Sequence, residues 1–148
     1  MSIIIVAGPA CAGKSTFIKE NFPDRDVVNL FDFQENLGLI TVRTVLDSYA
    51  HCKDALIEKI KEGKPVVLEH TLLKAIRRKY YIDAIREVTN EPIEIYYLLP
   101  DREIYREQLK LRELPCDDDF IDSSYLVAEI PTKDEGFDKV TVIRRGVK

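Results

Sequence analysis

The feature that most constrains the fold of this chain is the segment of residues 8–16. It has the sequence Gly-Pro-Ala-Cys-Ala-Gly-Lys-Ser-Thr, which fits the G-x-x-x-x-G-K-[ST] pattern of a phosphate-binding loop. An apolar stretch, residues 2–7, comes directly before it, and an expected helix, residues 14–21, is closed by Pro23. A strand, a loop and a helix N-terminus in this order direct backbone N–H groups and the positive end of the helix dipole at an anion. The segment therefore predicts a site for phosphate groups.

The residues of this loop have different expected roles in holding a nucleotide. The predicted phosphate-binding residues are Gly8, Pro9, Ala10, Cys11, Ala12, Gly13, Lys14, Ser15 and Thr16. Lys14 is expected to reach the β- and γ-phosphates, and the Ser15 hydroxyl is expected to bind Mg²⁺. The side chain of Cys11 is assigned no chemistry, because such loop positions contribute their backbone. We therefore expect ATP and Mg²⁺ as cofactors, although the sequence does not distinguish ATP from GTP.

Composition narrows the class of protein. The 148 residues are 45% hydrophobic and 32% charged, which is typical of one globular domain over residues 1–148. No apolar run approaches the roughly 20 residues of a membrane span, and no signal-peptide pattern is present, so we expect a cytoplasmic protein without membrane contact. The three cysteines have no metal-ligand spacing and are expected to be free thiols. A net charge of −4 argues against broad nucleic-acid binding but allows a local basic groove.

Strand and helix patterns alternate along the chain. Strands are expected at residues 2–7, 26–30, 66–68, 92–99 and 139–143. Helices are expected at residues 14–21, 41–62, 75–88 and 101–114, with a short one at 120–128 and an irregular loop at 31–40. This alternation predicts a P-loop NTPase-type α/β fold, a parallel sheet of about five strands flanked by helices on both faces.

Ligands of such sheets bind outside the carboxyl ends of the strands, so polar residues at those ends are candidates. Asp32 follows the second expected strand and is the predicted general base for an acceptor hydroxyl. Glu69 follows the third and is expected either to hold Mg²⁺ through water or to orient Thr71 or Lys14. For His70 a packed, structural role is favoured over catalysis. The sequence leaves open whether Glu69 and His70 are catalytic.

Two basic clusters are candidates for phosphate contacts. Arg102, Arg106 and Lys110 are four residues apart and share one helix face, whereas Arg112 lies off that face. Because a guanidinium binds phosphate oxygens with two parallel hydrogen bonds, at least one of Arg106 and Arg112 is predicted to contact phosphate. The second cluster, residues 77–79, is explained equally well by surface charge and by binding of an acceptor phosphate.

Other uses of a phosphate loop fit this sequence less well. A GTPase switch protein is expected to carry Asp-x-x-Gly and Asn-Lys-x-Asp elements, and neither is present. A motor or remodelling ATPase usually needs a larger body and a strongly acidic third strand, but this strand ends in Val67-Leu68-Glu69. Small size together with an arginine-bearing helix favours a kinase, which must hold a nucleotide, place Mg²⁺ and neutralise the moving phosphoryl group.

Several segments resemble the 5′-hydroxyl polynucleotide kinase domain of bacteriophage and animal end-repair enzymes, over roughly residues 2–143. Residues 63–71, Gly-Lys-Pro-Val-Val-Leu-Glu-His-Thr, resemble that family's Gly-Lys-x-Val-x-x-Asp-x-Thr, and Arg78 follows at the family's distance. Residues 111–114, Leu-Arg-Glu-Leu, are close to the family's version of its lid segment. Residues 129–137, Glu-Ile-Pro-Thr-Lys-Asp-Glu-Gly-Phe, resemble Glu-x-Pro-Thr-x-x-Glu-Gly-Phe.

The resemblance implies a role for each matching residue. Asp32 would be the base for the 5′-hydroxyl, and Lys14 and Ser15 would keep their phosphate and Mg²⁺ roles. Arg106 or Arg112 would clamp the transferred phosphate. The implied activity is transfer of the γ-phosphate of ATP to the 5′-hydroxyl end of a polynucleotide.

Departures from the family's pattern concern the acceptor. The family often has Asn-Arg-Asp where this chain has Leu30-Phe31-Asp32, so an arginine that could hold the acceptor's 3′-phosphate is missing there. The acidic run of residues 117–119 is an awkward neighbour for nucleic acid. Two alternatives therefore stay open: a kinase for a nucleoside, nucleotide or other small molecule, and a nucleotide-binding regulatory protein without turnover. The sequence does not determine the oligomeric state.

Overall fold

The computed structural model describes residues 2–9, 11–34, 42–114, 116–119, 121 and 128–145, without the side chains of residues 34, 42–45 and 145. The strands are β1 (Ile3–Ala7), β2 (Asp26–Asn29), β3 (Val66–His70), β4 (Ile93–Pro100) and β5 (Lys139–Arg145). The helices are α1 (Lys14–Asn21), α2 (Leu30–Gln34), α3 (Val42–Lys61), α4 (Ala75–Val88), α5 (Arg102–Leu111) and the 3₁₀ helix η2 (Lys133–Glu135).

The five strands form one parallel sheet in the order β2-β3-β1-β4-β5. β1 and β3 are buried along their whole length, which explains why both are almost continuous runs of apolar residues. The register pairs Ile4 with Val67 and Ala7 with His70, so the two central strands end level with each other. This order places the loop after β1 in the middle of the carboxyl edge of the sheet.

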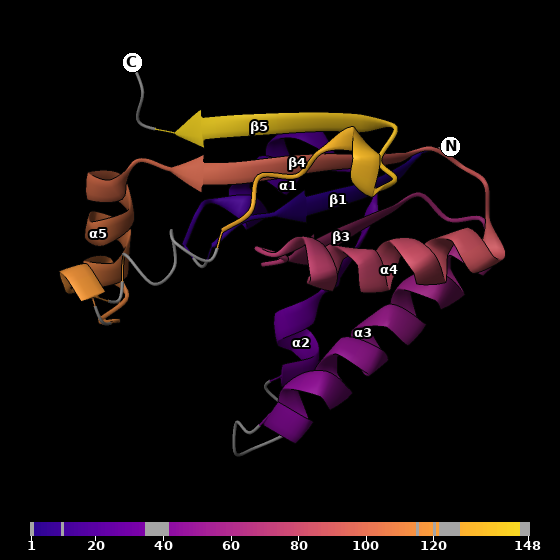
Figure 1. Cartoon of the computed structure of the whole chain (residues 1–148), viewed down its shortest axis with the longest axis horizontal. Coiled ribbons are helices and arrows are strands. Elements are labelled where there is room, and N and C mark those ends of the chain that lie inside the picture. Colours follow the sequence, from indigo (N-terminus) through magenta and orange to yellow (C-terminus); the bar gives the residue numbers. More distant parts are fainter. Residues whose placement is uncertain are drawn as a thin grey trace.

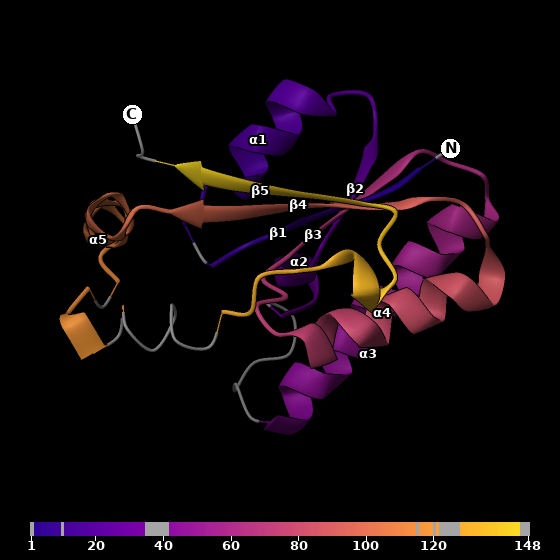
Figure 2. The same ribbon diagram turned by 45° about the horizontal axis from the view of Figure 1, so that its top comes forward.

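Helices cover both faces of the sheet. Figure 2 shows α1 on one side and α3 and α4 on the other, while α5 lies beyond the carboxyl ends of the strands. On the α1 side, Phe17 and Ile18 pack with residues of β1 and β4, including Ile4 and Leu98. On the opposite side a larger cluster joins the strands to Leu56 of α3 and Ile85 of α4. Full burial of each such side chain contributes about 1.5–3 kcal/mol. The predicted P-loop NTPase-type α/β fold is confirmed.

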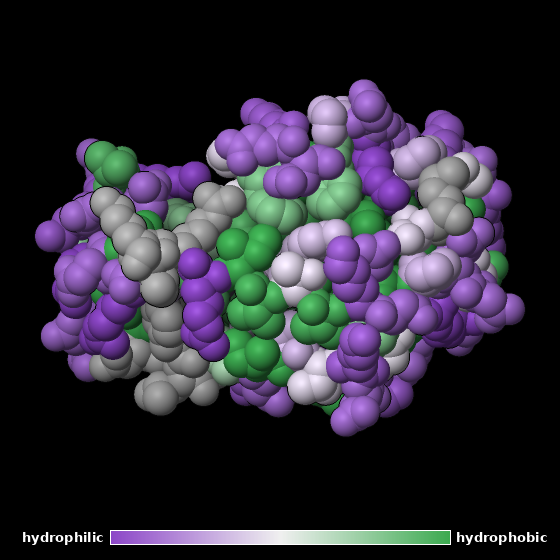
Figure 3. All heavy atoms as spheres, turned by 90° about the horizontal axis from the view of Figure 1, so that it is seen from above, coloured by the Kyte–Doolittle hydropathy of each residue, from purple (hydrophilic) through white to green (hydrophobic). Residues whose placement is uncertain are grey.

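β5 closes one edge of the sheet (Figure 1). Its residues 140–143 are only half-buried. Figure 3 looks onto this edge from above and shows apolar residues in the middle of the view with hydrophilic residues around them. Within the described part of the chain, no helix combines the length and apolar character that a membrane span requires.

The element bounds agree with the sequence expectations in most places. The helices at 14–21 and 75–88 have the predicted bounds, and the long helix runs over Val42–Lys61 within the described residues. The prediction of an irregular loop at 31–40 is wrong at its start, since α2 covers Leu30–Gln34. The Asn29 side chain accepts a hydrogen bond from the Phe31 backbone N–H at 3.0 Å, which favours a helix start at this point.

The helix expected to reach residue 114 ends instead at Leu111. Glu113 adopts a left-handed conformation with φ of 56°, and the Leu114 N–H donates to the Leu109 carbonyl at 2.9 Å. This wrapped geometry is a common way to terminate a helix. The short helix expected at 120–128 lies outside the described residues except for positions 121 and 128.

Candidate active site

The phosphate loop is fixed at its first glycine. Gly8 has φ of 150°, and a Cβ at this position would lie 2.3 Å from the Leu98 carbonyl oxygen of β4. The Gly8 N–H donates to the Thr71 carbonyl at 3.0 Å, just after β3. The start of the loop is therefore held between the ends of β3 and β4, where only a residue without a side chain fits.

The start of α1 is arranged to receive an anion. Gly13 is its N-cap residue with φ of 90°, and no side-chain cap is hydrogen-bonded at this end among the described residues. Cys11 also has a positive φ of 65°, while Ala10 lies outside the described residues. The first N–H groups of a helix have no intrahelical partner, and the helix dipole adds positive potential at this end. A phosphate group satisfies both conditions.

Lys14 is buried beneath the loop, with 5% of its surface exposed. Its Nζ donates to the carbonyl oxygens of Gly8 at 2.7 Å and Pro9 at 3.2 Å. Burial lowers the pKa of this ammonium group to about 8, and the nearby Glu69 carboxylate opposes that shift. A bound anion would act in the same direction as Glu69 and favour the charged form.

Glu69 joins three elements of the site. The Ser15 hydroxyl at the start of α1 donates to Glu69 Oε2 at 2.9 Å, and the Asn29 amide at the end of β2 donates to the same oxygen at 3.1 Å. Glu69 is 6% exposed. A hydroxyl and a carboxylate are hard oxygen ligands of the kind that Mg²⁺ binds, so these residues fit the predicted metal.

A cavity of about 170 Å³ lies over these residues. Its lining is Cys11, Ala12, Gly13, Lys14, Ser15, Thr16, Asn29, Phe31, Glu69 and Arg112. Arg112, at the C-terminal end of α5, is near enough for its charge to contribute to the lowered pKa of Lys14. The cavity thus unites the predicted loop residues with Glu69 and one of the two predicted clamp arginines.

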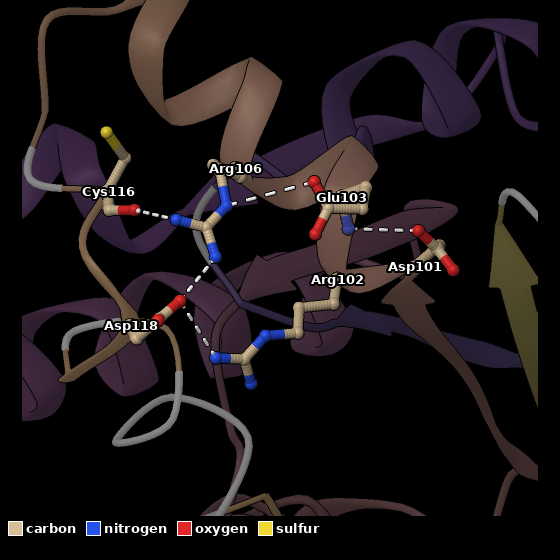
Figure 4. Close-up of polar contacts among 6 residues, drawn as sticks. All are labelled: Asp101, Arg102, Glu103, Arg106, Cys116 and Asp118. Atoms are coloured by element: carbon tan, nitrogen blue, oxygen red, sulfur yellow. Dashed lines mark hydrogen bonds and ion pairs between the residues drawn. The ribbon is translucent and has the colours of Figure 1, made fainter.

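Arg106, the other predicted clamp, is held elsewhere (Figure 4). Its guanidinium donates to the carboxylate of Asp118 and to the Cys116 carbonyl, the latter at 3.1 Å. Arg102 donates to the same Asp118 oxygen at 3.2 Å. Hydrogen bonds from the two arginines hold the pKa of Asp118 below its usual range. Arg106 is absent from the described lining of the cavity, and its side chain is engaged by the exposed carboxylate of Asp118.

Asp32 lies in the first turn of α2 and is exposed. Its neighbour Phe31 lines the cavity, so Asp32 is next to the cavity and outside its described lining. Burial raises the pKa of the Cys52 thiol in α3 to about 11, and the charge of Asp32 adds to this shift. Asp32 is therefore near both the cavity and α3.

His70 is turned away from the cavity into the core. It is 1% exposed, and its Nε2 lies 3.0 Å from the Tyr81 hydroxyl. The Tyr49 ring packs edge-on against it at a centroid distance of 4.7 Å. Burial lowers the pKa of His70 to about 3, and the positive charge of Lys14 adds to the effect. This residue is a neutral, packed group behind the phosphate loop.

Arg78, which the sequence places in a basic cluster and at the family's spacing, is completely buried. It forms a two-pronged ion pair with Glu135, at 2.7 Å and 3.1 Å, and donates to the Leu72 carbonyl at 2.9 Å. Glu135 also accepts from the Thr132 N–H at 2.9 Å, which closes a capping box at η2. Arg78 thus ties the chain segment before β5 to the loop after β3.

Sequence reasoning missed the role of Asn29 and the pairing of Arg78 with Glu135. Asn29 was assigned only to a strand, although a polar residue at a strand's carboxyl end was the available signal. The buried pairing of Arg78 with Glu135 had its only signal in the family's spacing, because the two residues are 57 positions apart in the sequence. The pairing of β2 with β3 brings Asn29 to Glu69, and the position of η2 brings Glu135 to Arg78.

Solved structures with this fold include several kinases. The chain is similar to a gluconokinase from Sinorhizobium meliloti, with 16% identity, a TM-score of 0.70 and coverage of 99% of this chain and 84% of that chain. It is similar to a sugar kinase from a Janibacter species, with 15% identity, a TM-score of 0.70 and coverage of 97% and 85%. It is also similar to part of the Pnkp1/Rnl/Hen1 RNA repair complex, with 16% identity, a TM-score of 0.71 and coverage of 85% and 43%.

At these identities the similarity establishes the fold. No curated protein sequence is significantly similar to this chain. A family model described as AAA domain matches residues 3–123 of the 148, from β1 to beyond α5. With its phosphate loop and parallel sheet, and with this match over most of its length, the chain belongs to the AAA domain family.

Proposed function

We propose that this chain is a kinase that moves the γ-phosphate of ATP to a hydroxyl acceptor, and that the acceptor is the 5′-hydroxyl end of a polynucleotide. The convergence of Lys14, Ser15, Glu69 and Arg112 on one cavity carries the proposal. The kinases among the structures of similar fold support phosphotransfer. The RNA repair complex and the motif resemblance support a nucleic-acid end as the acceptor.

The donor half of the site would act through positioning and charge. Lys14 would release the Gly8 and Pro9 carbonyls and bind the β- and γ-phosphates, and Arg112, which lines the same cavity, would contact the transferred phosphate. Ser15 directly and Glu69 through water would hold Mg²⁺, which supplies charge neutralisation when bound. The N-terminus of α1 would hold phosphate oxygens by its free N–H groups.

The acceptor half would depend on Asp32. The acceptor hydroxyl oxygen forms the new bond to the γ-phosphorus, the bond to the leaving ADP breaks, and Asp32 takes the hydroxyl proton. Its exposed position beside Phe31 leaves room for a large acceptor. Three free cysteines suit a reducing environment, and we propose a cytoplasmic location.

A kinase for a sugar, nucleoside or nucleotide is the second candidate, favoured by the gluconokinase and sugar kinase of similar fold. Labelled ATP offered with a 5′-hydroxyl oligonucleotide and, in parallel, with nucleosides, mononucleotides and gluconate distinguishes the two. Label on the oligonucleotide is expected. Label on a small molecule and never on the oligonucleotide would select the second candidate.

A regulatory nucleotide-binding protein without turnover would need no base at Asp32. We expect Asp32→Asn to retain ATP binding and to lose about a hundredfold or more in transfer rate, the usual scale of base catalysis. Asp24→Asn, an exposed carboxylate in the turn before β2, is the matched control. Steady-state turnover and nucleotide binding measured on both variants check this expectation. Equal turnover of the two variants would refute the assignment of the base.

A further inference from the structure

We propose that a groove between α3 and α4 binds a nucleotide of a single-stranded acceptor, next to the end that reacts. This inference rests on the proposed function and assigns a place to the part of the acceptor outside the catalytic cavity. Figures 1 and 2 show α3 and α4 together on one face of the sheet, inclined to each other. A cavity of about 530 Å³ lies between them, within the size range of small-ligand sites.

The lining of this groove combines apolar and aromatic surface. Leu46 and Tyr49 come from α3, and Ile76 and Tyr80 come from α4. Leu46 is 50% exposed, Ile76 67% and Tyr80 40%. Exposed apolar side chains gathered in one concave surface are a sign of a binding site.

Cations accompany both aromatic rings. The Arg77 guanidinium lies 5.6 Å from the centre of the Tyr49 ring, and the Lys53 ammonium lies 5.8 Å from the centre of the Tyr80 ring. Lys53 is paired with Asp54 at 3.2 Å. Among the residues that the structure describes, Lys53 and Lys79 of this region have carboxylate partners within ion-pair distance and Arg77 has none.

Tyr49 lines the groove and contacts a residue that lies close to the candidate active site. The Tyr49 side chain is hydrogen-bonded to Thr71, which follows Glu69 by two residues and whose carbonyl accepts from the Gly8 N–H. Asp32 lies in α2, which packs against α3, and its charge acts on Cys52, one turn beyond Tyr49. An acceptor with its hydroxyl at Asp32 can therefore extend along α3 into the groove.

These features select one class of occupant. Every nucleobase has a flat face that stacks on an aromatic ring, and each nucleotide adds a phosphate that an arginine can bind. The ring of Tyr80 supplies a surface on which a base can stack, and Arg77 supplies a cation for the phosphate. Lys79 is paired with Asp83 at 2.6 Å, which leaves Arg77 as the cation that we assign to the acceptor phosphate.

The test is binding of a 5′-hydroxyl single-stranded oligonucleotide, labelled at its 3′ end, measured by fluorescence anisotropy without ATP. Tyr80→Ala is expected to raise the Kd about tenfold, within the usual range for loss of one base stack. Arg77→Ala is expected to raise the Kd by a similar factor and to reduce the slope of log K against log salt by about 0.7. Tyr80→Phe, which keeps the ring, is expected to bind like the unmodified protein.

Lys61→Ala is the matched control. This exposed lysine lies on α3, which forms one wall of the groove, but about 20 Å beyond Leu46 at 1.5 Å per residue. An unchanged Kd in Arg77→Ala and Tyr80→Ala, or an equal loss in Lys61→Ala, would overturn the groove assignment. Binding also separates the two proposals. If phosphate is transferred to the oligonucleotide but the groove substitutions leave its Kd unchanged, the groove assignment alone is refuted. If the groove substitutions raise the Kd but no phosphate is transferred, the proposed function alone is refuted.

Discussion

The phosphate loop and the arginines of α5 belong to the same predicted machinery, yet they are held in different ways. Lys14 and Glu69 are buried, and their polar atoms are bonded to groups from the loop, from α1 and from β2. Arg102 and Arg106 are held by Asp118, whose side chain is 70% exposed. Buried hydrogen bonds are costly to leave unmade, whereas exposed ion pairs contribute little. We therefore expect the loop to keep its conformation, and we expect Arg102 and Arg106 to give up Asp118 readily for another anion.

The largest expected effect tests the buried half of this comparison. Lys14→Ala removes the cation proposed to contact the γ-phosphate, and we expect turnover to fall about a thousandfold, or about 4 kcal/mol of transition-state stabilisation. ATP affinity should fall as well. Lys19→Ala, an exposed lysine on the same helix, is the matched control. Unchanged ATP affinity in Lys14→Ala, measured by equilibrium binding, would contradict the role of the loop.

A second substitution tests how rigidly the loop is fixed. In Gly8→Ala the new Cβ meets the Leu98 carbonyl oxygen at 2.3 Å, so we expect the free energy of unfolding to fall by about 3 kcal/mol. Gly63→Ala is the control, since its φ of 72° is also positive but no atom lies within 4 Å of the added carbon. It should cost about 1 kcal/mol from backbone strain alone. Equal losses in urea denaturation would mean that the loop can move away from β4.

The buried histidine behind the loop predicts a dependence of stability on pH. Its pKa is about 3 in the folded chain and about 6.5 when unfolded, so the unfolded state binds more protons between these values. Stability should therefore fall as the pH is lowered from 6.5, with a slope approaching about 1.4 kcal/mol per pH unit. Denaturation midpoints between pH 6.5 and 4.5 measure it.

The two histidines provide the comparison for this measurement. His70→Gln is expected to remove most of the slope, whereas His51→Gln, at an exposed position of α3, is expected to leave it unchanged. A slope that survives in His70→Gln would show that other groups carry the pH dependence.

The smallest effect tests the exposed half of the comparison. Asp118→Asn should release Arg102 and Arg106 for nucleotide phosphates, so we expect the KM for ATP to fall about two- to fivefold with little change in stability. Asp117→Asn removes the same charge from the neighbouring exposed position. If both variants behave alike, the effect is one of net charge and the Asp118 contact has no special part in it.

Much of the donor site was predictable because it is local in sequence. The segment of residues 8–16 contains its own strand end, glycines and helix start, so its pattern specifies an anion site without distant partners. Glu69 was also predictable, since the carboxyl ends of parallel strands meet at one edge. The hydrogen bond from the Ser15 hydroxyl to Glu69 shows that the two residues are in direct contact, as that expectation requires.

The remaining features depend on segments distant in sequence. Arg106 and Arg112 both matched the expectation for a clamp, but the end of α5 at Leu111 and the position of Asp118 place only Arg112 at the cavity. The sequence left Arg78 between a surface charge and a contact to an acceptor phosphate, whereas the structure pairs it with Glu135, 57 residues away.

The sequence by itself therefore determined the α/β class, the phosphate loop and the strand-end carboxylate, because each depends on local pattern and on the parallel order of the strands. Only the tertiary structure decided that Arg112 lines the cavity, that Arg78 pairs with Glu135 in the interior, and that Arg106 pairs with the exposed Asp118. Side-chain charge is encoded residue by residue, but its partners are selected by how helices and strands pack. The role of the phosphate loop can be predicted from its own residues, whereas the role of an arginine depends on the residues that pack around it.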